Sequence, residues 1–410
     1  MTATTSKHSD RVLNAAVLVA ALGYFVDIYD LILFSIVRRS SLLAVGVPAR
    51  ELLDRGVLLL NMQMTGMLVG GLLWGILGDR RGRLSTLFGS IVLYSAANLA
   101  NAFVHDLTTY AVVRFIAGVG LAGELGAGVT LASELLSRHK RGYGTTLIAG
   151  VGLLGGVTAG LVGDRVPWRT AYIIGGCLGI ALLVLRIGVS ESRMFDDVRK
   201  SGVSRGNVFL LFTQWARARR FVAIILVGIP IWFVAGILVT FCPEFGRAMH
   251  MTSVPTAARA VLWFYAGLAV GDFSSGTLSQ LVRSRKRVLF GALVVTIVGI
   301  ALYFTIASRS LTSFYGVCLF LGIGNGYWAV FVTVAAEQFG TNLRATAATS
   351  IPNLVRGSVP LLTMSFQFAK RRIGILNGAI VVGAVTLVLA FAALWLLDET
   401  FGKDLNFVES

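Results

Sequence analysis

Residues 75–83 read GILGDRRGR and place one acid and three arginines between two long apolar segments. These segments, residues 56–78 and 84–104, contain no other ionisable side chain. Each is close to the roughly 20 residues that a helix needs to cross the hydrocarbon core of a bilayer. Because arginines are costly to bury in lipid, we expect the turn to lie in water and to join two antiparallel membrane helices.

The composition extends this interpretation to the whole chain. Of the 410 residues, 56% are hydrophobic, and the mean hydropathy is +0.78, far above what a soluble domain needs. The pattern predicts an all-α polytopic membrane protein with twelve transmembrane helices, approximately at residues 12–37, 56–78, 84–104, 109–136, 143–163, 169–190, 220–242, 258–281, 287–307, 312–337, 345–369 and 374–397.

The net charge of +16 is distributed unevenly over this pattern. More lysines and arginines fall on the side of the two termini, the 75–83 turn and the central segment than on the other side, although Lys370, Arg371 and Arg372 lie on the less basic side. The positive-inside rule therefore predicts that both termini are cytoplasmic. We assign the basic charge to a face beside anionic lipid and expect no nucleic-acid partner.

The sequence offers no pattern for an enzyme, a cofactor or a metal. Cys177, Cys242 and Cys318 lie in apolar runs without disulfide or metal-ligand spacing. The four histidines and these cysteines form no nucleophile or ligand arrangement. We therefore predict a protein that is not an enzyme and that uses no cofactor or metal.

Charged residues inside the predicted helices of the first half are the first candidate site. Asp27 and Asp30 lie three residues apart and share a helix face. A charge at the bilayer centre costs about 2.5–3.5 kcal/mol, so two acids on one face require a wet cavity, a proton or a cation. The alternative for Asp27 is a place at a helix end near water. Arg114 and Glu124 occur in the fourth run, among glycines that we interpret as helix-packing positions.

The second half contains fewer polar residues inside its apolar runs. They are Asp272, Asn325, Trp328, Asn353 and Arg356. Asn353 and Arg356 share a helix face, and the nearby Pro352 and Pro360 can loosen the backbone or simply kink it.

Several motifs resemble one known family. The 75–83 stretch resembles the G-x-L-x-D-R-x-G-R signature of the major facilitator superfamily, with Gly75, Asp79, Arg80, Gly82 and Arg83 at its fixed positions. The E-x(6)-R-G pattern that begins at Glu134 and the ETFGKDL tail are similar to motifs of sugar and metabolite porters. Tyr29-Asp30, the R-x-x-x-G-x-G at Arg114 and the AGELGAG around Glu124 look like the metabolite:proton symporter branch.

This resemblance implies two homologous six-helix bundles with the substrate site between them. A shift of 203 residues aligns Glu134 with Glu337 and Arg141 with Arg344, as such a repeat requires. We predict an N-terminal bundle at residues 1–189, a cytoplasmic central loop at 190–219, and a C-terminal bundle with a cytoplasmic tail at 220–410. The second signature turn is eroded, because Gln280 stands where Asp79 stands in the first.

The same resemblance implies roles for the candidate residues. The signature residues Asp79, Arg80 and Arg83, together with Glu134, Arg141, Glu337 and Arg344, are expected to stabilise one conformational state. Solute contacts are assigned to Tyr29, Asn325, Trp328, Asn353 and Arg356, with Arg356 on an anionic group or, alternatively, in a structural pair with Asp272. Proton coupling is assigned to Asp27, Asp30, Arg114 and Glu124. Asp30 is the expected proton carrier, Arg114 tunes it, and Asp27 and Glu124 are reserves.

The implied activity is secondary active transport of a small organic solute, such as an organic anion, by alternating access with protons. We expect a monomer in a bacterial plasma membrane. The alternatives are a passive facilitator, an exporter of drugs or metabolites, and a non-transporting sensor. A sensor has little reason to hold six ionisable groups inside helices, because each costs about 2.5–3.5 kcal/mol when unpaired.

Overall fold

The computed structural model describes residues 15–81, 83–135, 141–190 and 212–403, and these ranges are helical with short connections and no strands. The first half forms one group of helices, which pack mainly on each other. They are α1 (Ala15–Ala44), the short η1 (Ala49–Glu51), α2 (Leu52–Arg81), α3 (Arg83–Asn101), α4 (Leu107–Leu135), α5 (Arg141–Arg165) and α6 (Trp168–Ser190).

The second half forms the other group, and three of its membrane segments are irregular. Its elements are α8 (Trp215–Phe233), the π-helical η3 (Val234–Val239), α9 (Cys242–Ala248), α10 (Ala257–Leu281), α11 (Arg285–Thr305), η4 (Ala307–Arg309), α12 (Leu311–Asn325), α13 (Trp328–Glu337), α14 (Thr341–Gly357), α15 (Val359–Ile373) and α16 (Ile375–Leu396). Three predicted spans of the described ranges are each occupied by two consecutive elements, namely α8 with η3, α12 with α13, and α14 with α15. Each half therefore has six spans.

These twelve segments confirm the predicted fold class. Seven helical stretches of the described residues are long and apolar enough to cross a membrane by length and composition. Residues 87–101 of α3 and 107–123 of α4 are apolar helical stretches of shorter length. The first helix is longer than predicted and runs to Ala44, while α8 begins at Trp215, inside the predicted central loop.

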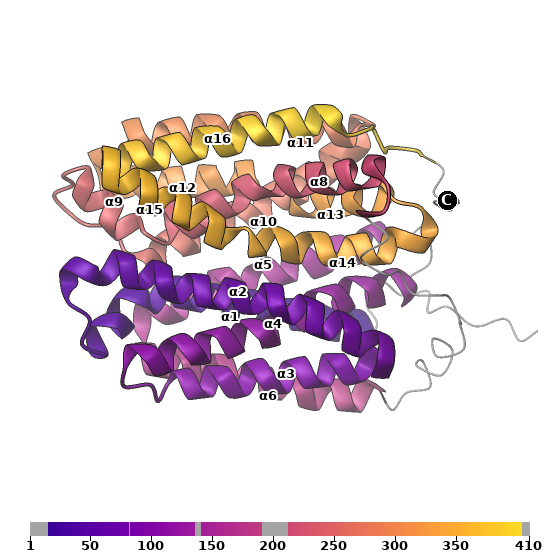
Figure 1. Cartoon of the computed structure of the whole chain (residues 1–410), viewed down its shortest axis with the longest axis horizontal. Coiled ribbons are helices and arrows are strands. Elements are labelled where there is room, and N and C mark those ends of the chain that lie inside the picture. Colours follow the sequence, from indigo (N-terminus) through magenta and orange to yellow (C-terminus); the bar gives the residue numbers. More distant parts are fainter. Residues whose placement is uncertain (1–14, 82, 136–140, 191–211, 404–410) are drawn as a thin grey trace, which may run out of the picture.

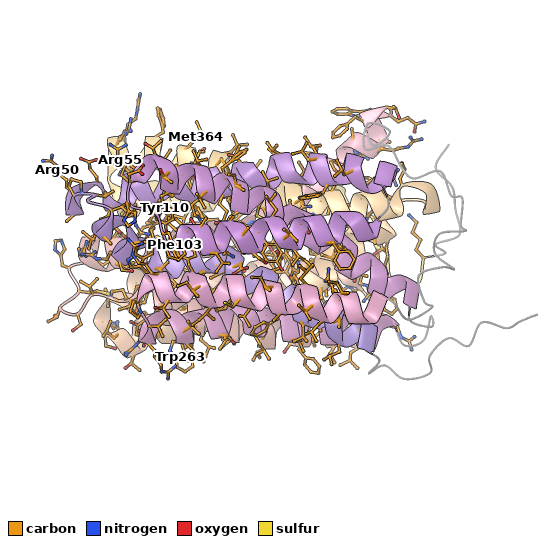
Figure 2. The ribbon with its side chains drawn as sticks, turned by 90° about the horizontal axis from the view of Figure 1, so that it is seen from below. Arg50, Arg55, Phe103, Tyr110, Trp263 and Met364 are labelled. Carbon is orange, nitrogen blue, oxygen red and sulfur yellow. The ribbon has the colours of Figure 1, made fainter. Side chains whose placement is uncertain are left out.

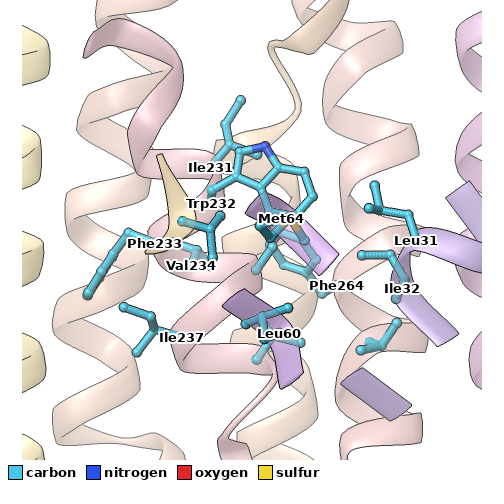
Figure 3. Packing of buried hydrophobic residues seen from close by; sticks show 14 of the residues in the cluster. Leu31, Ile32, Leu60, Met64, Ile231, Trp232, Phe233, Val234, Ile237 and Phe264 are labelled. Carbon is cyan, nitrogen blue, oxygen red and sulfur yellow. The ribbon is translucent and has the colours of Figure 1, made fainter. Parts of the chain in front are cut away.

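The two bundles lie side by side along their lengths, with α1–α6 below and α8–α16 above in Figure 1. Buried apolar side chains from α1, α2, α8, η3 and α10 meet in the seam, including Leu31, Met64, Trp232 and Phe264 (Figure 3). Exposed apolar residues such as Trp263, Met364 and Phe103 lie on the periphery (Figure 2). The apolar core is therefore continuous from one bundle to the other.

Equivalent helices make equivalent close contacts in the two bundles. A side chain at Gly118 would overlap the carbonyl oxygen of Gln63, so α4 packs backbone to backbone on α2. At Gly322 a side chain would overlap the carbonyl oxygen of Phe264, so α12 packs on α10 in the same way. Small residues at such crossings provide the van der Waals contact that holds helices together in lipid. This agrees with the internal repeat found in the sequence.

The end of the molecule that holds the α1–α2 connection is closed by ion pairs between the bundles. Arg38 Nη2 lies 2.6 Å from Glu244 Oε2, Lys370 Nζ lies 2.6 Å from Asp54 Oδ1, and Arg259 Nε lies 3.2 Å from Asp164 Oδ2. Figure 2 shows Arg50 and Arg55 at this same end.

The first predicted span ends too early, at residue 37, because Arg38 belongs to α1. Arg38 is 1% exposed, donates to the Leu52 carbonyl oxygen at 2.9 Å and stacks on the Phe241 ring. With Glu244 as counter-ion, the guanidinium can be buried, so α1 continues for two further turns.

We expect Gly322→Ala to destabilise the protein because the added methyl group must push α12 away from α10. Overpacking of this kind costs about 1–3 kcal/mol. Gly316→Ala in the same helix is the matched control, since nothing lies within 4 Å of its added carbon. Thermal unfolding of the detergent-purified variants measures the difference. Equal midpoints for the two variants would show that this crossing is not tightly packed.

Candidate functional site

One ion pair between the two bundles is fully buried in the seam. Asp27 Oδ2 of α1 lies 3.4 Å from Arg356 Nη1 of α14. The two side chains are 0% and 1% exposed, so the pair is fully buried. Neither charge could be held there alone at low cost, because desolvation of a single ion inside a protein costs several kcal/mol. The pair therefore ties α1 to α14 through electrostatics.

Aromatic side chains surround this pair. The guanidinium carbon of Arg356 lies 6.0 Å from the centre of the Trp328 ring, which packs against Phe331 at 5.3 Å. Tyr24, one turn before Asp27, interacts with Trp328 and lies within electrostatic range of Arg356 and Asp27. Tyr265 of α10 lies in the same group. The guanidinium therefore lies among aromatic faces and hydroxyl groups, which can contact both a charge and a ring.

Glycines of α5 make room for two of these rings. A side chain at Gly152 would overlap the Tyr24 ring, and one at Gly156 would overlap the Tyr265 ring. The sequence analysis missed both tyrosines. The spacing of three between Tyr24 and Asp27 was an available signal, because it places them on one helix face. Tyr265 had no comparable signal in its own helix.

Asp272, considered above as a structural partner of Arg356, instead binds the start of α13. Its Oδ1 accepts a hydrogen bond at 2.7 Å from the backbone N–H of Ala329, in the first turn of α13. A carboxylate at this place satisfies a free helix N-terminal N–H group and complements the helix dipole. The alternative pairing of Arg356 with Asp272 is therefore wrong in this structure, because Asp27 is the acid that reaches Arg356.

The break that Asp272 stabilises separates α12 from α13. Gly326 lies against the backbone of Gly271 and Asp272, closer than any other residue type permits. Asn325 ends α12 and donates from Nδ2 to the Leu321 carbonyl oxygen at 2.8 Å. Interrupted helices at mid-membrane are typical of transporter binding sites, because they expose backbone groups beside a cavity. The sequence Gly324-Asn325-Gly326 is a helix-stop signal that the sequence analysis did not use.

Asn353 also lies in the seam. Its Nδ2 is 3.4 Å from the Ala122 carbonyl oxygen of α4, so it joins the bundles one turn before Arg356. The helix that carries both residues ends at Gly357, and α15 starts with Pro360 in its first turn. Pro352 lies inside α14 without ending it.

Asp30 and Arg114 lie inside the N-terminal bundle, and both are 0% exposed. Asp30 faces Gly175 of α6, with Asn98 and Asp27 close by. Arg114 stacks on Phe34 at 4.4 Å, near Tyr172. Polar neighbours among the described residues are the Asn98 amide for Asp30 and the Tyr172 hydroxyl group for Arg114, and no ion pair joins the two. The structure thus brings them into one region without a direct bond between them.

Tyr29, predicted to bind solute, lies on another side of α1. Its hydroxyl group donates to the Ala171 carbonyl oxygen of α6 at 3.1 Å, and the side chain is fully buried. This contact gives it a packing role within the N-terminal bundle.

The conformational residues are described only in part. The side chains of Glu124, Gly75, Asp79, Arg80, Arg83, Glu134, Arg141 and Arg344, and all of Gly82, lie outside the described residues. Glu337 is described, and its Oε1 lies 3.6 Å from Arg285 Nη2. Its Oε2 accepts from the Thr400 hydroxyl group at 2.7 Å, which connects the C-terminal tail motif to α13 and α11.

The fold and the buried polar seam together define a polytopic membrane protein of the transporter type. A family model of the Major Facilitator Superfamily matches residues 56–364. The chain therefore belongs to that superfamily, as the signature turn predicted.

Similar proteins include named transporters. A niacin transporter of Acinetobacter baylyi is 27% identical over 85% of this chain and 86% of its own length. A gentisate transporter of Corynebacterium glutamicum is 24% identical over 94% of this chain and 88% of its own length. Among solved structures, a D-xylose–proton symporter superimposes with a TM-score of 0.72 at 17% identity, covering 95% of this chain and 99% of that one. The last comparison shows the shared fold.

We expect Asp27→Asn to destabilise the protein strongly, because it leaves the Arg356 guanidinium buried without its anion. Loss of one member of a buried pair costs about 3–5 kcal/mol. The double variant Asp27→Asn/Arg356→Gln removes both charges and should recover most of that loss. Arg55→Gln is the control, because its pair with Glu51 is exposed and worth under about 1 kcal/mol. Thermal unfolding of all variants tests this, and a double variant no more stable than Asp27→Asn alone would contradict it.

Proposed function

We propose that this protein is a secondary transporter that moves a small aromatic carboxylate across the membrane together with a proton, by alternating access. The observation that supports this most directly is the buried pair between Asp27 and Arg356, which joins the two bundles within an aromatic site. We further propose that it acts as a monomer in a bacterial inner membrane, with both termini in the cytoplasm.

The chemistry of the site favours an anion with a ring. A carboxylate can form charge-assisted hydrogen bonds with the Arg356 guanidinium, and a ring can pack against Trp328, Tyr24 and Tyr265. Niacin and gentisate, which are named for two similar proteins, each contain an aromatic ring and a carboxylate. A 4-hydroxybenzoate transporter of Pseudomonas putida, 32% identical over 37% of this chain, is named for a solute of the same kind.

The pair offers a way to couple the solute to a proton. A solute carboxylate that bonds to Arg356 takes the place of Asp27 and leaves that acid beside Asp30, with which it already interacts. Two buried carboxylates side by side repel each other, and one shared proton removes most of that repulsion. Solute and proton then favour each other's binding, which is the thermodynamic requirement for symport.

The places where the bundles are joined support alternating access. The ion pairs of Arg38, Lys370 and Arg259 close the end that is outer in the proposed orientation. Opening that end requires these pairs to separate, so this structure corresponds to a state closed toward the outside. A passive facilitator would use Asp30 only as the counter-ion of Arg114, and the lack of a direct bond between these two described residues favours the proton role.

Arg356→Gln should reduce the affinity for aromatic acids about 10- to 100-fold, because a hydrogen bond to a charged group contributes about 1.5–3 kcal/mol. Binding of nicotinate, 4-hydroxybenzoate and their uncharged amides to purified protein measures this. Wild-type protein should prefer the acids, and that preference should disappear in Arg356→Gln/Asp27→Asn, which keeps the seam neutral. Arg371→Gln, at an exposed site, is the control. Unchanged acid binding in the variants, or a cationic solute, would overturn the proposed site.

Asp30→Asn should abolish accumulation of solute driven by a pH gradient and leave counterflow intact, because counterflow requires no net proton movement. Reconstituted vesicles allow both measurements on the same protein. Glu51→Gln is a control that changes an acid whose pair with Arg55 does not join the two bundles. If Asp30→Asn accumulates solute like the wild type, the proton carrier is Asp27 or Glu124. If the wild-type protein itself shows counterflow but no uptake driven by the pH gradient, it is a passive facilitator.

A further inference from the structure

A pocket of about 740 Å³ lies at the lipid-facing side of the C-terminal bundle, between the start of α11 and the end of α16. Arg283, Lys286 and Arg287 line it at the end where the chain turns from α10 into α11. Phe290, Phe391 and Trp395 line it farther along the two helices. None of its lining residues belongs to the Asp27–Arg356 site, and the pocket takes no part in the proposed function.

The acidic side chain at this pocket, Glu399, forms its hydrogen bonds with groups of the protein itself. Glu399 accepts hydrogen bonds from the Ser284 hydroxyl group and from the backbone N–H groups of Arg285, at 2.9 Å, and Lys286, at 3.2 Å. Partial burial by itself raises the pKa of Glu399, but these bonds outweigh it and hold the pKa below its usual range. Glu399 therefore stays ionised and occupies the N-terminus of α11, so that helix end offers no free anion site.

The remaining charge at the pocket is positive. Lys286 Nζ donates to the carbonyl oxygens of Trp395, at 3.1 Å, and Leu397, at 2.7 Å. Arg283 and Arg287 are exposed, and no carboxylate of the described residues forms an ion pair with either of them. Three cations against one acid leave an excess of two positive charges. Arg283 also has a φ of 52°, a backbone conformation that is costly for a residue with a side chain.

The apolar wall of the pocket faces outward. Trp395 is 84% exposed and Phe290 is 54% exposed, and Phe290 packs edge to face with Phe391 at 5.3 Å between ring centres. Exposed tryptophan next to arginine is typical of the level of lipid headgroups. Phe290 follows Arg287 by three residues in α11, and Phe391 precedes Trp395 by four residues in α16, so both rings lie farther along the helices from the basic end.

We propose that this pocket binds an anionic phospholipid of the adjoining leaflet, which is the cytoplasmic leaflet in the proposed orientation. The phosphate group lies between Arg283 and Arg287, and the first part of an acyl chain lies along Phe290, Phe391 and Trp395. A soluble phosphate would use only the arginines, and an acidic peptide would leave the outward aromatic wall in contact with lipid tails. A basic region followed along the helices by an apolar surface matches the headgroup and the acyl chain of one lipid molecule.

The test is native mass spectrometry of the full-length protein, titrated with phosphatidylglycerol or phosphatidylcholine. We expect preferential binding of phosphatidylglycerol that falls about 10- to 30-fold in Arg283→Gln/Arg287→Gln. Arg309→Gln/Arg371→Gln removes the same charge from exposed sites at the opposite end and should bind like the wild type. Equal loss in both double variants would show general charge attraction and overturn the site.

Two further measurements distinguish the source of the phosphate and the place of the chain. Glycerol 3-phosphate should not compete with phosphatidylglycerol at equal concentration, and competition would identify a site for free phosphate instead. Phosphatidylglycerol with brominated acyl chains should quench wild-type tryptophan fluorescence more than that of Trp395→Phe. Equal quenching of the two proteins would place the chain elsewhere and overturn the proposal.

Discussion

The arrangement of this molecule depends on one constraint, which is that a charge inside a membrane protein is costly without a partner. Asp27 and Arg356 meet this constraint across the seam, although they lie 329 residues apart in the chain. The contact fixes α1 relative to α14, and with them one bundle relative to the other. Because each charge depends on the other, the seam can separate only if another group replaces one partner. In the proposed cycle, a solute carboxylate replaces Asp27 as the partner of Arg356, and a proton neutralises the acid that is released.

The helices of the C-terminal bundle are irregular where they meet this pair. The break between α12 and α13 brings Trp328 beside Arg356, and Asp272 satisfies the N-terminus that the break creates. The end of α14 at Gly357 follows directly after Arg356. A continuous helix would satisfy its backbone internally and leave only side chains to face the seam. The irregular segments thus concentrate polar groups where the bundles join.

The sequence predicted the twelve segments well, because hydropathy and charge change sharply at each turn, as they do at residues 75–83. It also identified Asp27, Asp30, Arg114 and Arg356 as costly charges. It could not pair them, because the partner of each depends on packing between distant helices, and the acid considered for Arg356 proved to cap α13. The first predicted span stopped before Arg38 for the same reason, since its partner Glu244 lies 206 residues away. Roles of the signature residues stay predictions.

Two acids one turn apart on α1 face different surroundings. Asp27 points across the seam to a guanidinium of the other bundle, while Asp30 points into its own bundle, toward Gly175 and the region of Arg114. Rotation of one bundle against the other changes the distance from Asp27 to Arg356 but leaves Asp30 and Arg114 in the same bundle. In the proposed cycle, Asp27 therefore senses the solute and the position of the bundles, and Asp30 holds the proton at a place that moves little. Because the two acids are close, the charge on either one changes the free energy of ionising the other. In the proposed cycle, solute binding at Asp27 therefore affects proton binding at Asp30.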